Sequence, residues 1–336
     1  MRFALIGAGA IGTVHARLID ALGNEAVLVA VVDQNVERGG KLAEQYGAHV
    51  YATPAEAYAA EELDAVGICL PSALHADVAI EALEAGKHVI VEKPVDITLE
   101  AADRLLAAQQ ATGLTVSVIS QRRFQPPVAQ IRAAIDGGAL GRVTSGIAES
   151  AFFRPQSYYD GDDWRGTLAV DGGGALMNQG IHALDLLVWM LGRPVRVSAQ
   201  TGRLAHEGIE VEDLAGASIV FESGAIGLML ASTAAYPGRP VRLTIHGDQG
   251  TAVLDDDALA YFASANGEPP EAAALPGPDD WGPVELAHLA QYRDFIAAVR
   301  EGRPPAVTVE AGRRSLATVL AVYESARTGR PVELEN

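Results

Sequence analysis

A lysine stands directly after an apolar run in the segment HVIVEKP, residues 88–94. The run should form an interior strand ended by Pro94, whereas lysine is usually a solvated surface residue. A partly desolvated amine has a lowered pKa and can exchange protons near neutrality. Lys93 is therefore a candidate acid–base residue, and Glu92 is expected to orient Lys93 or a cofactor.

The chain opens with a glycine pattern, GxGxxG, between a strand expected over 2–6 and a helix expected over roughly 10–22. Glycine permits a tight turn and brings backbone N–H groups close to a pyrophosphate, although the pattern alone also fits an ordinary glycine turn. Five residues are candidates for contact with such a ligand: Gly7, Gly9, Ala10, Ile11 and Gly12.

An acidic residue, Asp33, closes the strand VLVAVVD about twenty residues after the glycines, where a carboxylate can accept both ribose hydroxyls of a dinucleotide. Its charge would repel the 2′-phosphate of NADP, and no arginine follows it immediately. NAD is therefore the predicted cofactor. Arg38 leaves NADP open, because an arginine near the ribose can neutralise a phosphate.

A second loop, residues 69–75, joins a strand to a helix at the expected carboxyl edge of the sheet, where ligands bind. Its candidates for cofactor contact are Leu70, Pro71, Ser72 and His75. Ser72 also fits a helix cap. His75 opens a helix, and a histidine there is more often a structural hydrogen-bond partner than a catalyst.

A glycine run at 172–174 leads into a helix expected over roughly 175–191 and ended by Gly192. Asn178, His182 and Asp185 recur at i, i+4 and i+7, so they should share one helix face beside an apolar stripe. Such a polar row suggests the wall of a site. Asp185 could orient His182, but we favour a structural role in which it bonds the helix to its surroundings.

Arginines and aromatic side chains precede this glycine run and could line a substrate site. They are Arg122, Arg154, Tyr158, Tyr159, Trp164 and Arg165. Aromatic faces stack on sugar rings and arginines pair with carboxylates or phosphates, although exposed aromatics also serve as subunit contacts. Both interpretations stay open, and Arg122, Trp164, Arg165 and Asn178 are candidate substrate-binding residues.

The hydrophobic pattern changes along the chain, and its two parts predict different elements to position these residues. Up to Arg122, short apolar runs alternate with amphipathic segments, at 2–6, 27–32, 65–70, 87–91 and 114–119. This alternation predicts a doubly wound parallel sheet. From about Arg142, longer alternating runs follow at 142–153, 195–204, 214–222, 225–234, 240–247 and 250–262, which predict an open, mostly antiparallel sheet.

We therefore expect two domains, a dinucleotide-binding domain over 1–122 and an α+β domain over 123–336 for substrate binding and oligomerisation. The proline-rich segment 264–283 is expected to be a surface excursion and not a linker.

Composition restricts the class of protein. The 336 residues are 49% hydrophobic, and 25 basic against 43 acidic residues give a net charge of -18, which argues against nucleic acid or anionic membranes as partners. The opening MRFALIG leaves no long apolar leader before Gly7, so secretion is not expected. No apolar stretch approaches the length needed to cross a bilayer, so no membrane span is expected. The single cysteine, Cys69, cannot form an internal disulfide, so a reducing cytoplasm is expected. No metal site is predicted.

Several stretches together resemble the Gfo/Idh/MocA oxidoreductases, named for glucose-fructose oxidoreductase and inositol dehydrogenase. They are ALIGAGAIG, CLPSALHADVAIEALEAGKHVIVEKP, GGGALMNQGIHALDLLVWMLG and SLATVLAVYESARTGRPV. The family's Glu-Lys-Pro signature stands at residues 92–94. The resemblance implies hydride transfer between NAD(P) and a secondary alcohol of a sugar, an inositol or a sugar derivative, with Lys93 and His182 handling the proton.

The resemblance also implies further roles. The loop at Pro71 should lie along the nicotinamide ribose, although many relatives have Asn where Ser72 stands. His182 falls on the family's substrate-facing histidine. Asn178 departs from the Asp of many inositol dehydrogenase-like members, which weakens an Asp–His relay. The open sheet face should build a homodimer or homotetramer, with Trp281 and Tyr292 among the residues expected at subunit contacts.

Two other functions stay open. A redox-shuttle glycosidase would use the same cofactor without net NADH formation. A non-catalytic NAD-binding regulatory protein would share the fold, although an intact Lys93 and His182 argue against it.

Overall fold

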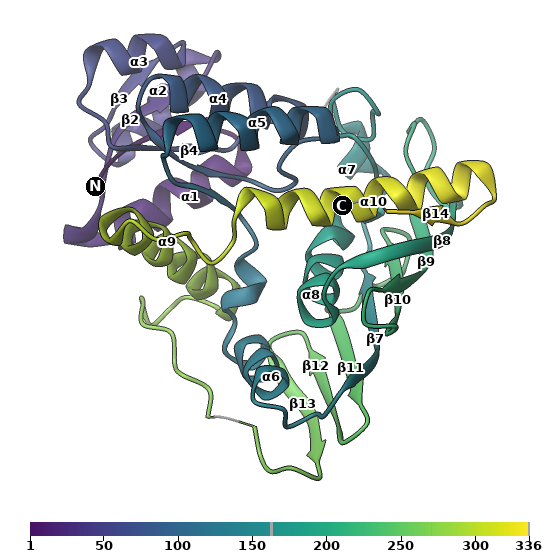
Figure 1. Ribbon diagram of the computed structural model, residues 1–336. Helices are drawn as coiled ribbons and strands as arrows, with labels where there is room; N and C mark the ends of the chain where they lie inside the picture. Colours follow the sequence, from purple (N-terminus) through teal and green to yellow (C-terminus); the bar gives the residue numbers. More distant parts are fainter. Residues whose placement is uncertain (162–163, 270, 335–336) are drawn as a thin grey trace. The chain divides into compact units, whose positions relative to one another are not determined.

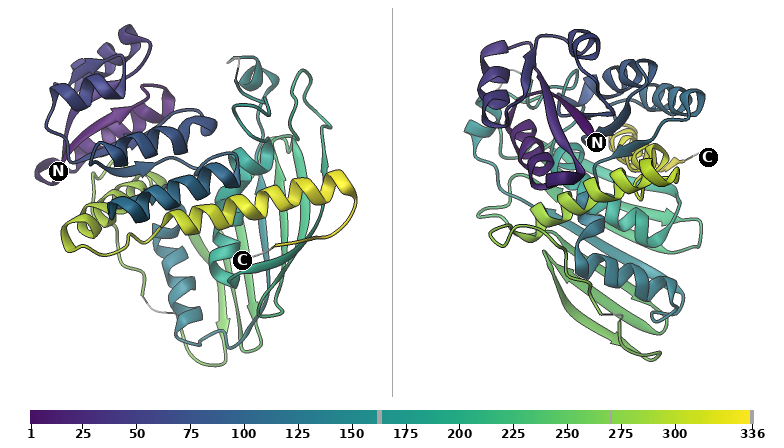
Figure 2. Two further views of the ribbon diagram at one scale, coloured as in Figure 1. Left: turned by 45° about the horizontal axis from the view of Figure 1, so that its top comes forward. Right: turned by 90° about the vertical axis from the view of Figure 1, so that its left-hand side faces the viewer.

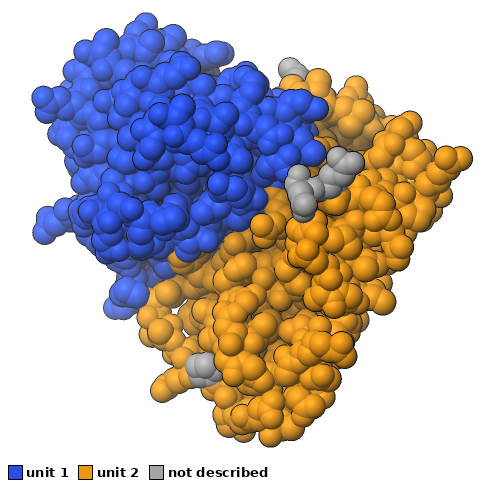
Figure 3. All heavy atoms as spheres, viewed as in Figure 1, with its two compact units in different colours: residues 1–121, 276–313 blue, residues 122–275, 314–336 orange. Residues whose placement is uncertain are grey.

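The structure is a computed structural model that describes residues 1–161, 164–269 and 271–334. It divides into two compact units, residues 1–121 with 276–313 and residues 122–275 with 314–336 (Figure 3). The first division falls next to the predicted boundary after residue 122. The segment 276–313, however, returns to the first unit instead of staying with residues 123–275.

The return of this segment has a packing cause. Helix α9 (Pro283–Glu301) places its apolar side chains in one buried cluster with β1, among them Tyr292, Phe295, Phe3 and Leu5. Tyr292 is fully buried there, so its expected place at a subunit contact is wrong. Trp281, just before α9, packs against the same cluster and lies under the guanidinium of Arg17, 4.5 Å from the ring centroid.

The first unit contains a parallel sheet of six strands (Figure 1). They are β1 (Arg2–Ile6), β2 (Val27–Val32), β3 (His49–Tyr51), β4 (Ala65–Ile68), β5 (His88–Val91) and β6 (Val116–Val118). Their order, β3-β2-β1-β4-β5-β6, confirms the predicted doubly wound sheet. Because the winding reverses between β1 and β4, ligands are expected at the carboxyl ends of these two strands.

Helices connect these strands, and local residues set their ends. They are α1 (Ala10–Ala21), α2 (Val36–Gln45), α3 (Pro54–Ala60), α4 (His75–Glu84) and α5 (Leu99–Thr112), with short 3₁₀ turns η1 (Gly23–Glu25) and η2 (Ser72–Leu74). The side chains of Thr53 and Thr98 cap α3 and α5. Gly113, with φ of 69°, ends α5.

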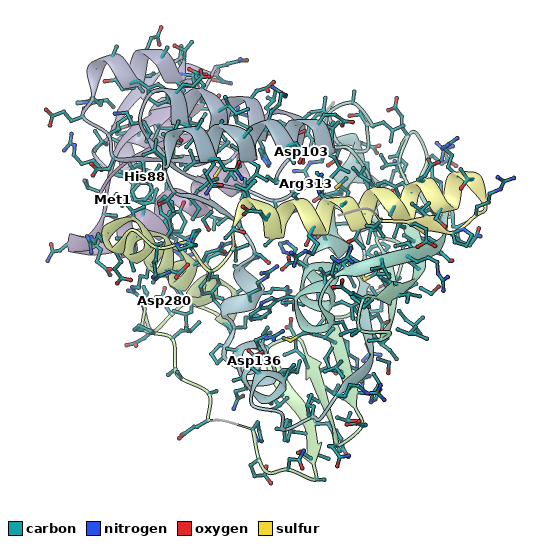
Figure 4. All side chains as sticks on the ribbon, viewed as in Figure 1. Met1, His88, Asp103, Asp136, Asp280 and Arg313 are labelled. Carbon is teal, nitrogen blue, oxygen red and sulfur yellow. The ribbon has the colours of Figure 1, made fainter. Side chains whose placement is uncertain are left out.

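Helix α10 (Val309–Thr328) begins in the first unit and continues in the second. Its first turns are tied to α5, because Arg313 and Asp103 form an ion pair in which Arg313 Nη2 lies 3.1 Å from Asp103 Oδ2 (Figure 4). No helix in the described ranges is long and apolar enough to span a bilayer.

The second unit is built on an eight-stranded sheet with the order β13-β12-β11-β7-β10-β9-β8-β14. The strands are β7 (Val143–Ala151), β8 (Pro194–Gly202), β9 (Leu214–Phe221), β10 (Ile226–Ser232), β11 (Arg242–Gly247), β12 (Gly250–Asp255), β13 (Ala258–Ser264) and β14 (Val332–Glu333). Among the strand pairs described in this second sheet, only β7 and β10 pair in parallel, which confirms a mostly antiparallel sheet. The predicted single run 250–262 is two strands joined by a turn at Asp256, which has φ of 55°.

One face of this sheet is covered by α8 (Ile181–Leu191), which packs on β7, β10 and β11 (Figure 2). Gly146 and Gly227 lie where Leu187 of α8 meets the sheet, and a Cβ on either would lie about 3 Å from its methyl groups. The unit also contains η3 (Gln121–Phe124, begun in the first unit), α6 (Pro126–Asp136) and α7 (Gln156–Asp160).

Candidate active site

The predicted glycine turn lies at the carboxyl end of β1. Gly7 has φ of 101°, and a Cβ there would overlap the carbonyl oxygen of Cys69. A Cβ on Gly12 would overlap the carbonyl oxygen of Gly7, so α1 can pack on the turn only with glycine. Nothing lies within 4 Å of a Cβ on Gly9. Gly7 and Gly12 are therefore packed against the protein, whereas Gly9 faces open space, as close approach of a pyrophosphate requires.

Asp33 follows β2 beside this turn and is 5% exposed. Its carboxylate accepts hydrogen bonds from the backbone N–H groups of Ala8 and Asn35, each at 2.8 Å, and from Arg38 Nη2 at 2.9 Å. Burial alone would raise the pKa of Asp33, but these hydrogen bonds outweigh it and hold the pKa below its ordinary value. The site thus presents an ionised carboxylate.

A hollow of about 320 Å³ lies next to Asp33 and is lined by Ala8, Thr13, Asn35, Arg38 and Lys41, among others. Its size falls in the range of small-molecule sites. Together, the open glycine turn, the carboxylate and the hollow fit the pyrophosphate, ribose and adenine parts of a dinucleotide. Ala10 and Ile11 begin α1 at the same turn and are partly or fully exposed.

The loop of residues 70–75 follows β4, on the other side of the switch point from β1. Leu70 and Pro71 are half-buried and Ser72 is 9% exposed. The alternative interpretation of Ser72 as a helix cap is wrong. Helix α4 starts later, at His75, and Asp96 accepts the Ala76 N–H at 3.2 Å.

His75 is buried within the chain, and its ring nitrogens lie 2.6 Å from the carbonyl oxygen of Pro94 and 2.8 Å from that of Leu70. Burial lowers the pKa of His75 despite these acceptors. The geometry therefore supports a role in tying the loop at Leu70 to the segment after Lys93. Direct contact with a cofactor stays a prediction.

Glu92 and Lys93 follow β5 at the same sheet edge. Lys93 is half-buried, and the peptide bond between Lys93 and Pro94 is cis. Glu92 is 6% exposed and points inward: Oε2 accepts the Lys93 N–H at 3.0 Å, and Oε1 lies 3.0 Å from His15 Nε2. Glu92 thus orients the Lys93 backbone from inside the unit.

His15, Glu92 and His288 have ligand atoms within 4.8 Å of one another, which is close enough to share a metal ion. Both ring nitrogens of His15, however, already face protein partners, Glu92 and the Tyr292 hydroxyl. Hydrogen bonds therefore already engage both ring nitrogens of His15.

In the second unit, the glycine run 172–174 is held by Glu212. Its carboxylate accepts the N–H groups of Gly174 and Leu176, at 2.9 and 2.8 Å, and the Tyr323 hydroxyl at 3.0 Å. A Cβ on Gly174 would overlap the Glu212 carbonyl oxygen, so a larger residue cannot follow this path. Burial raises the pKa of Glu212 above its ordinary value.

The helix after the glycine run differs from the prediction. Residues Ala175–Gly180 form a π-helical turn (η4), and regular α-helix begins only at Ile181. A π turn holds more residues than an α turn, so the regular helical spacing predicted for Asn178, His182 and Asp185 does not hold across it. A local π turn of this kind is often found at functional sites.

The three polar residues of that row have different surroundings. Asn178 Nδ2 donates to Asp171 Oδ1 at 2.9 Å. Asp185 accepts a two-point ion pair from Arg123, at 2.7 and 2.6 Å, and the Ser315 hydroxyl at 2.8 Å. These bonds support the structural role favoured for Asp185. His182 is half-buried at the start of α8.

The candidate substrate residues separate into two groups. Arg165 lies over the rings of Tyr158 and Trp164, 4.4 and 5.0 Å from their centroids, and Arg154 lies over Tyr158 from 5.2 Å. Gln179 connects this cluster to the π turn, because its amide accepts from Arg154 at 3.1 Å and its nitrogen lies 3.3 Å from Asn178 Oδ1.

The two other candidates have different surroundings. Tyr159 is 7% exposed and packs on Ile209 and Val211 in a small core, with its ring edge-to-face on Tyr158 at 5.1 Å. Arg122 is 9% exposed, and its partner is Asp256, 3.6 Å away at the turn between β12 and β13. Burial lowers the pKa of Arg122, and Asp256 opposes that shift.

Sequence reasoning missed His15, Gln179 and Glu212. A signal existed for His15, which occupies the buried face of α1 with Gly12, Ala16 and Ile19, where an apolar residue is expected. Gln179 and Glu212 gave no such signal, because their roles depend on contacts with residues distant in sequence.

Comparison with known families gives two matches that together span most of the chain. Residues 1–120 match the model of the oxidoreductase family with an NAD-binding Rossmann fold, GFO_IDH_MocA. Residues 128–253 match the GFO/IDH/MocA C-terminal domain.

Individual proteins are similar over nearly their full length. Inositol 2-dehydrogenase of Rhizobium meliloti (strain 1021) is 30% identical over 341 residues, covering 99% of both chains. The WlbA dehydrogenase from Bordetella pertussis, solved with NADH and UDP-GlcNAcA, is 32% identical with a TM-score of 0.89 and covers 100% and 98% of the two chains. GenD2 from gentamicin A biosynthesis, solved with NAD, is 30% identical with a TM-score of 0.86 and covers 100% and 97%.

Proposed function

The chain belongs to the GFO/IDH/MocA family of NAD-binding oxidoreductases, and from that premise we propose that it oxidises a secondary alcohol of a sugar, an inositol or a sugar derivative. The observation that carries the proposal is the placement of Lys93. It follows an interior strand of the dinucleotide-binding sheet, and the buried carboxylate of Glu92 holds its backbone. The sequence similarity of named inositol and sugar dehydrogenases supports the substrate class.

NAD, when bound, supplies the hydride acceptor. The chain's own residues would hold it at three points. Gly9 leaves room for the pyrophosphate at the start of α1. Asp33 would exchange its contact with Arg38 for the ribose hydroxyls. The loop at Leu70 and Pro71, across the switch point, would lie along the nicotinamide ribose, with Ser72 beside it.

Lys93 and His182 would handle the proton. In the oxidation, one C–H and one O–H bond of the substrate break and a C=O bond forms. The hydrogen leaves carbon as hydride, and the hydroxyl proton passes to Lys93 together with His182. A positioned amine and imidazole can supply this acid–base step in both directions. In the reduction, the same two side chains return the proton to the carbonyl oxygen.

The π turn and its neighbours would bind the rest of the substrate. Asn178 and the cluster of Arg154, Tyr158, Trp164 and Arg165 present amide, aromatic and cationic groups, which suit sugar rings and their polar substituents. The cluster is linked to Asn178 through Gln179. Arg122 would contribute by fixing the turn at Asp256 or by contacting the substrate directly.

We also propose that the protein is a cytoplasmic homodimer or homotetramer built through the uncovered sheet face. Apolar side chains of β7 and β10 alternate outward there: Ile147, Ile226, Leu228 and Leu230 are 44%, 52%, 47% and 41% exposed. Leu228 and Ile147 are direct neighbours across the strand pair, so they form a continuous apolar row. Pairing with the same row of a second copy would bury these side chains. Sedimentation of the purified protein gives its oligomeric state and tests this. The single cysteine, Cys69, is a buried thiol, which suits a reducing compartment.

The experiment that tests the activity follows NADH formation by absorbance across inositols, aldoses, anhydrosugars, sugar acids and nucleotide sugars. NADH formation with one of these classes supports a dehydrogenase. Glycoside cleavage without net NADH would favour the redox-shuttle glycosidase. NAD binding with no turnover of any class would favour a regulatory protein.

A further inference from the structure

A chain of buried hydrogen bonds lies behind Lys93 and joins three elements of the first unit. It runs from Tyr292 of α9 to His15 of α1 and on to Glu92 after β5. The Tyr292 hydroxyl lies 2.7 Å from His15 Nδ1, and His15 Nε2 lies 3.0 Å from Glu92 Oε1. Tyr292 and His15 are 0% exposed and Glu92 is 6% exposed. Water therefore does not compete for these bonds.

The direction of the hydrogen bonds follows from the partners. Burial raises the pKa of the Tyr292 phenol well above its ordinary value, so the hydroxyl keeps its proton and can donate. The Glu92 carboxylate can only accept, so we assign the ring proton of His15 to Nε2, and Nδ1 then accepts from Tyr292. Each donor thus points toward Glu92, and Glu92 Oε2 in turn accepts the Lys93 N–H.

The surroundings of Glu92 keep it charged. The titratable groups that face it are His15 from α1, His75 from α4, His288 and Tyr292 from α9, Cys69 after β4, and Lys93 itself. Burial alone would raise the pKa of Glu92, but the hydrogen bond from His15 and nearby positive charge, including that of Lys93, hold it well below its usual range.

A buried ionic group is costly to desolvate, and replacing a buried charged pair with well-packed apolar residues is often neutral for stability. Packing alone therefore does not explain Glu92. A fixed negative charge next to an amine stabilises the protonated amine, and the size of that effect depends on where the charge is held. His15 fixes the position of this charge, and Tyr292 fixes the ring of His15.

We propose that His15 and Tyr292 are positioning residues that hold Glu92 as a fixed carboxylate beside Lys93 and thereby set how tightly the Lys93 amine binds its proton. The proposal deepens the function proposed above, because it concerns the side chain assigned to proton transfer. It gives α9, which lies about two hundred residues after Lys93 in the chain, a role in tuning that side chain.

The sequence makes this measurable without a substrate, since it contains three lysines, Lys41, Lys87 and Lys93. The folded enzyme is acetylated with a trace of acetic anhydride from pH 6 to 11, and mass spectrometry gives the titration midpoint of each lysine. Lys41, whose side chain is 72% exposed, and Lys87, which donates to the Leu63 carbonyl, serve as internal references. The variants are Glu92→Gln, His15→Ala, His15→Gln and Tyr292→Phe.

A matched control is Tyr58→Phe. Its hydroxyl is also buried in the first unit, and it has no hydrogen-bond partner among the described residues. NADH binding and thermal unfolding of each variant show whether the unit is intact. If His15→Ala does not fold, Tyr292→Phe decides the matter, since it removes a single oxygen atom.

We expect Glu92→Gln to lower the Lys93 midpoint by about one pH unit, as loss of a nearby anion should. His15→Ala should lower it in the same direction, because Glu92 without its donor takes up a proton. Tyr292→Phe should give a smaller drop, and His15→Gln, which can still donate to Glu92, should restore most of the midpoint. Tyr58→Phe and the two reference lysines should not move.

Three results would overturn the proposal: an unmoved Lys93 midpoint in His15→Ala and Tyr292→Phe, a drop of equal size in the Tyr58→Phe control, or one equivalent of metal in the purified protein, with His15 as a ligand. The proposed function fails separately. If the pH profile of turnover does not follow the Lys93 midpoint, Lys93 is not the acid–base group, whatever the labelling shows.

Discussion

Arg38 lies across the carboxylate of Asp33, with its Nη2 2.9 Å from both carboxylate oxygens and its Nε 3.1 Å from Oδ2. In the proposed binding mode, the ribose hydroxyls of NAD contact this same carboxylate. Arg38 is 56% exposed at its side chain, whereas that of Asp33 is 3% exposed, so Arg38 can leave and Asp33 cannot. NADH must displace this arginine, while the 2′-phosphate of NADPH could pair with it.

Arg38→Ala should therefore tighten NADH binding by a few-fold and weaken NADPH binding by about tenfold, because an ionic partner of the phosphate is lost. Asp33→Ala should shift the preference toward NADPH. Titration calorimetry with both nucleotides measures the ratio, and Lys87→Ala serves as the control. A ratio that stays at the wild-type value in both variants would show that neither residue reads the ribose.

A methyl group at Gly9 should separate folding from cofactor binding. Its Cβ would meet nothing within 4 Å, so Gly9→Ala should unfold within about 2 °C of the wild type. The added methyl occupies the space through which a pyrophosphate approaches, and NADH affinity should fall by about tenfold or more. Gly216→Ala, with equally open space in the second unit, is the matched control. Undiminished NADH binding by Gly9→Ala would contradict the assigned turn.

Asn178 should not tolerate aspartate. Asn178 donates to Asp171, which is 3% exposed, so Asn178→Asp would place two carboxylates together. We expect a loss of about 2 kcal/mol in the free energy of unfolding, measured by denaturant titration. The double variant with Asp171→Asn restores a donor and should recover most of the loss. If Asn178→Asp and the double variant are equally stable, the hydrogen bond between Asn178 and Asp171 does not stabilise the π turn.

Glu212 should make the second unit less stable as pH rises. Its pKa is raised by burial, so between its unfolded value near 4.5 and its higher folded value the native state binds more protons than the unfolded state. Stability from this group is therefore greatest below that window and declines as pH rises through it. Glu212→Gln does not ionise, so its stability relative to wild type should improve as pH rises from 4.5 to 8. Melting temperatures of both proteins across this pH range test this. A difference in melting temperature that does not change with pH would contradict it.

The sequence predicted the first unit's elements well where pattern and turn chemistry agree. The strand at 2–6 and the strand at 27–32 match β1 and β2, because an apolar run ends in each case at a residue of different character, Gly7 or Asp33. The strand β3 was missed, since it has only three residues, one exposed and two half-buried, with no buried apolar alternation.

The features that sequence could not predict depend on distant contacts. His15 and Tyr292 meet across 277 positions, and α9 returns to the first unit because its apolar face completes a core begun at β1. The π turn at Ala175–Gly180 is equally hidden, since Glu212 from another segment holds its N–H groups while the residue pattern reads as an ordinary helix.

The central claim is that Lys93 exchanges the proton during hydride transfer, and Lys93→Ala tests it most directly. The measurement is the rate of NADH formation with the best substrate of the panel, beside NADH affinity, for wild type, Lys93→Ala and the control Lys87→Ala. We predict that Lys93→Ala loses turnover by about a hundredfold or more, as removal of a positioned acid–base group should, with NADH affinity within a few-fold of wild type. Turnover by Lys93→Ala at the rate of Lys87→Ala would contradict the account.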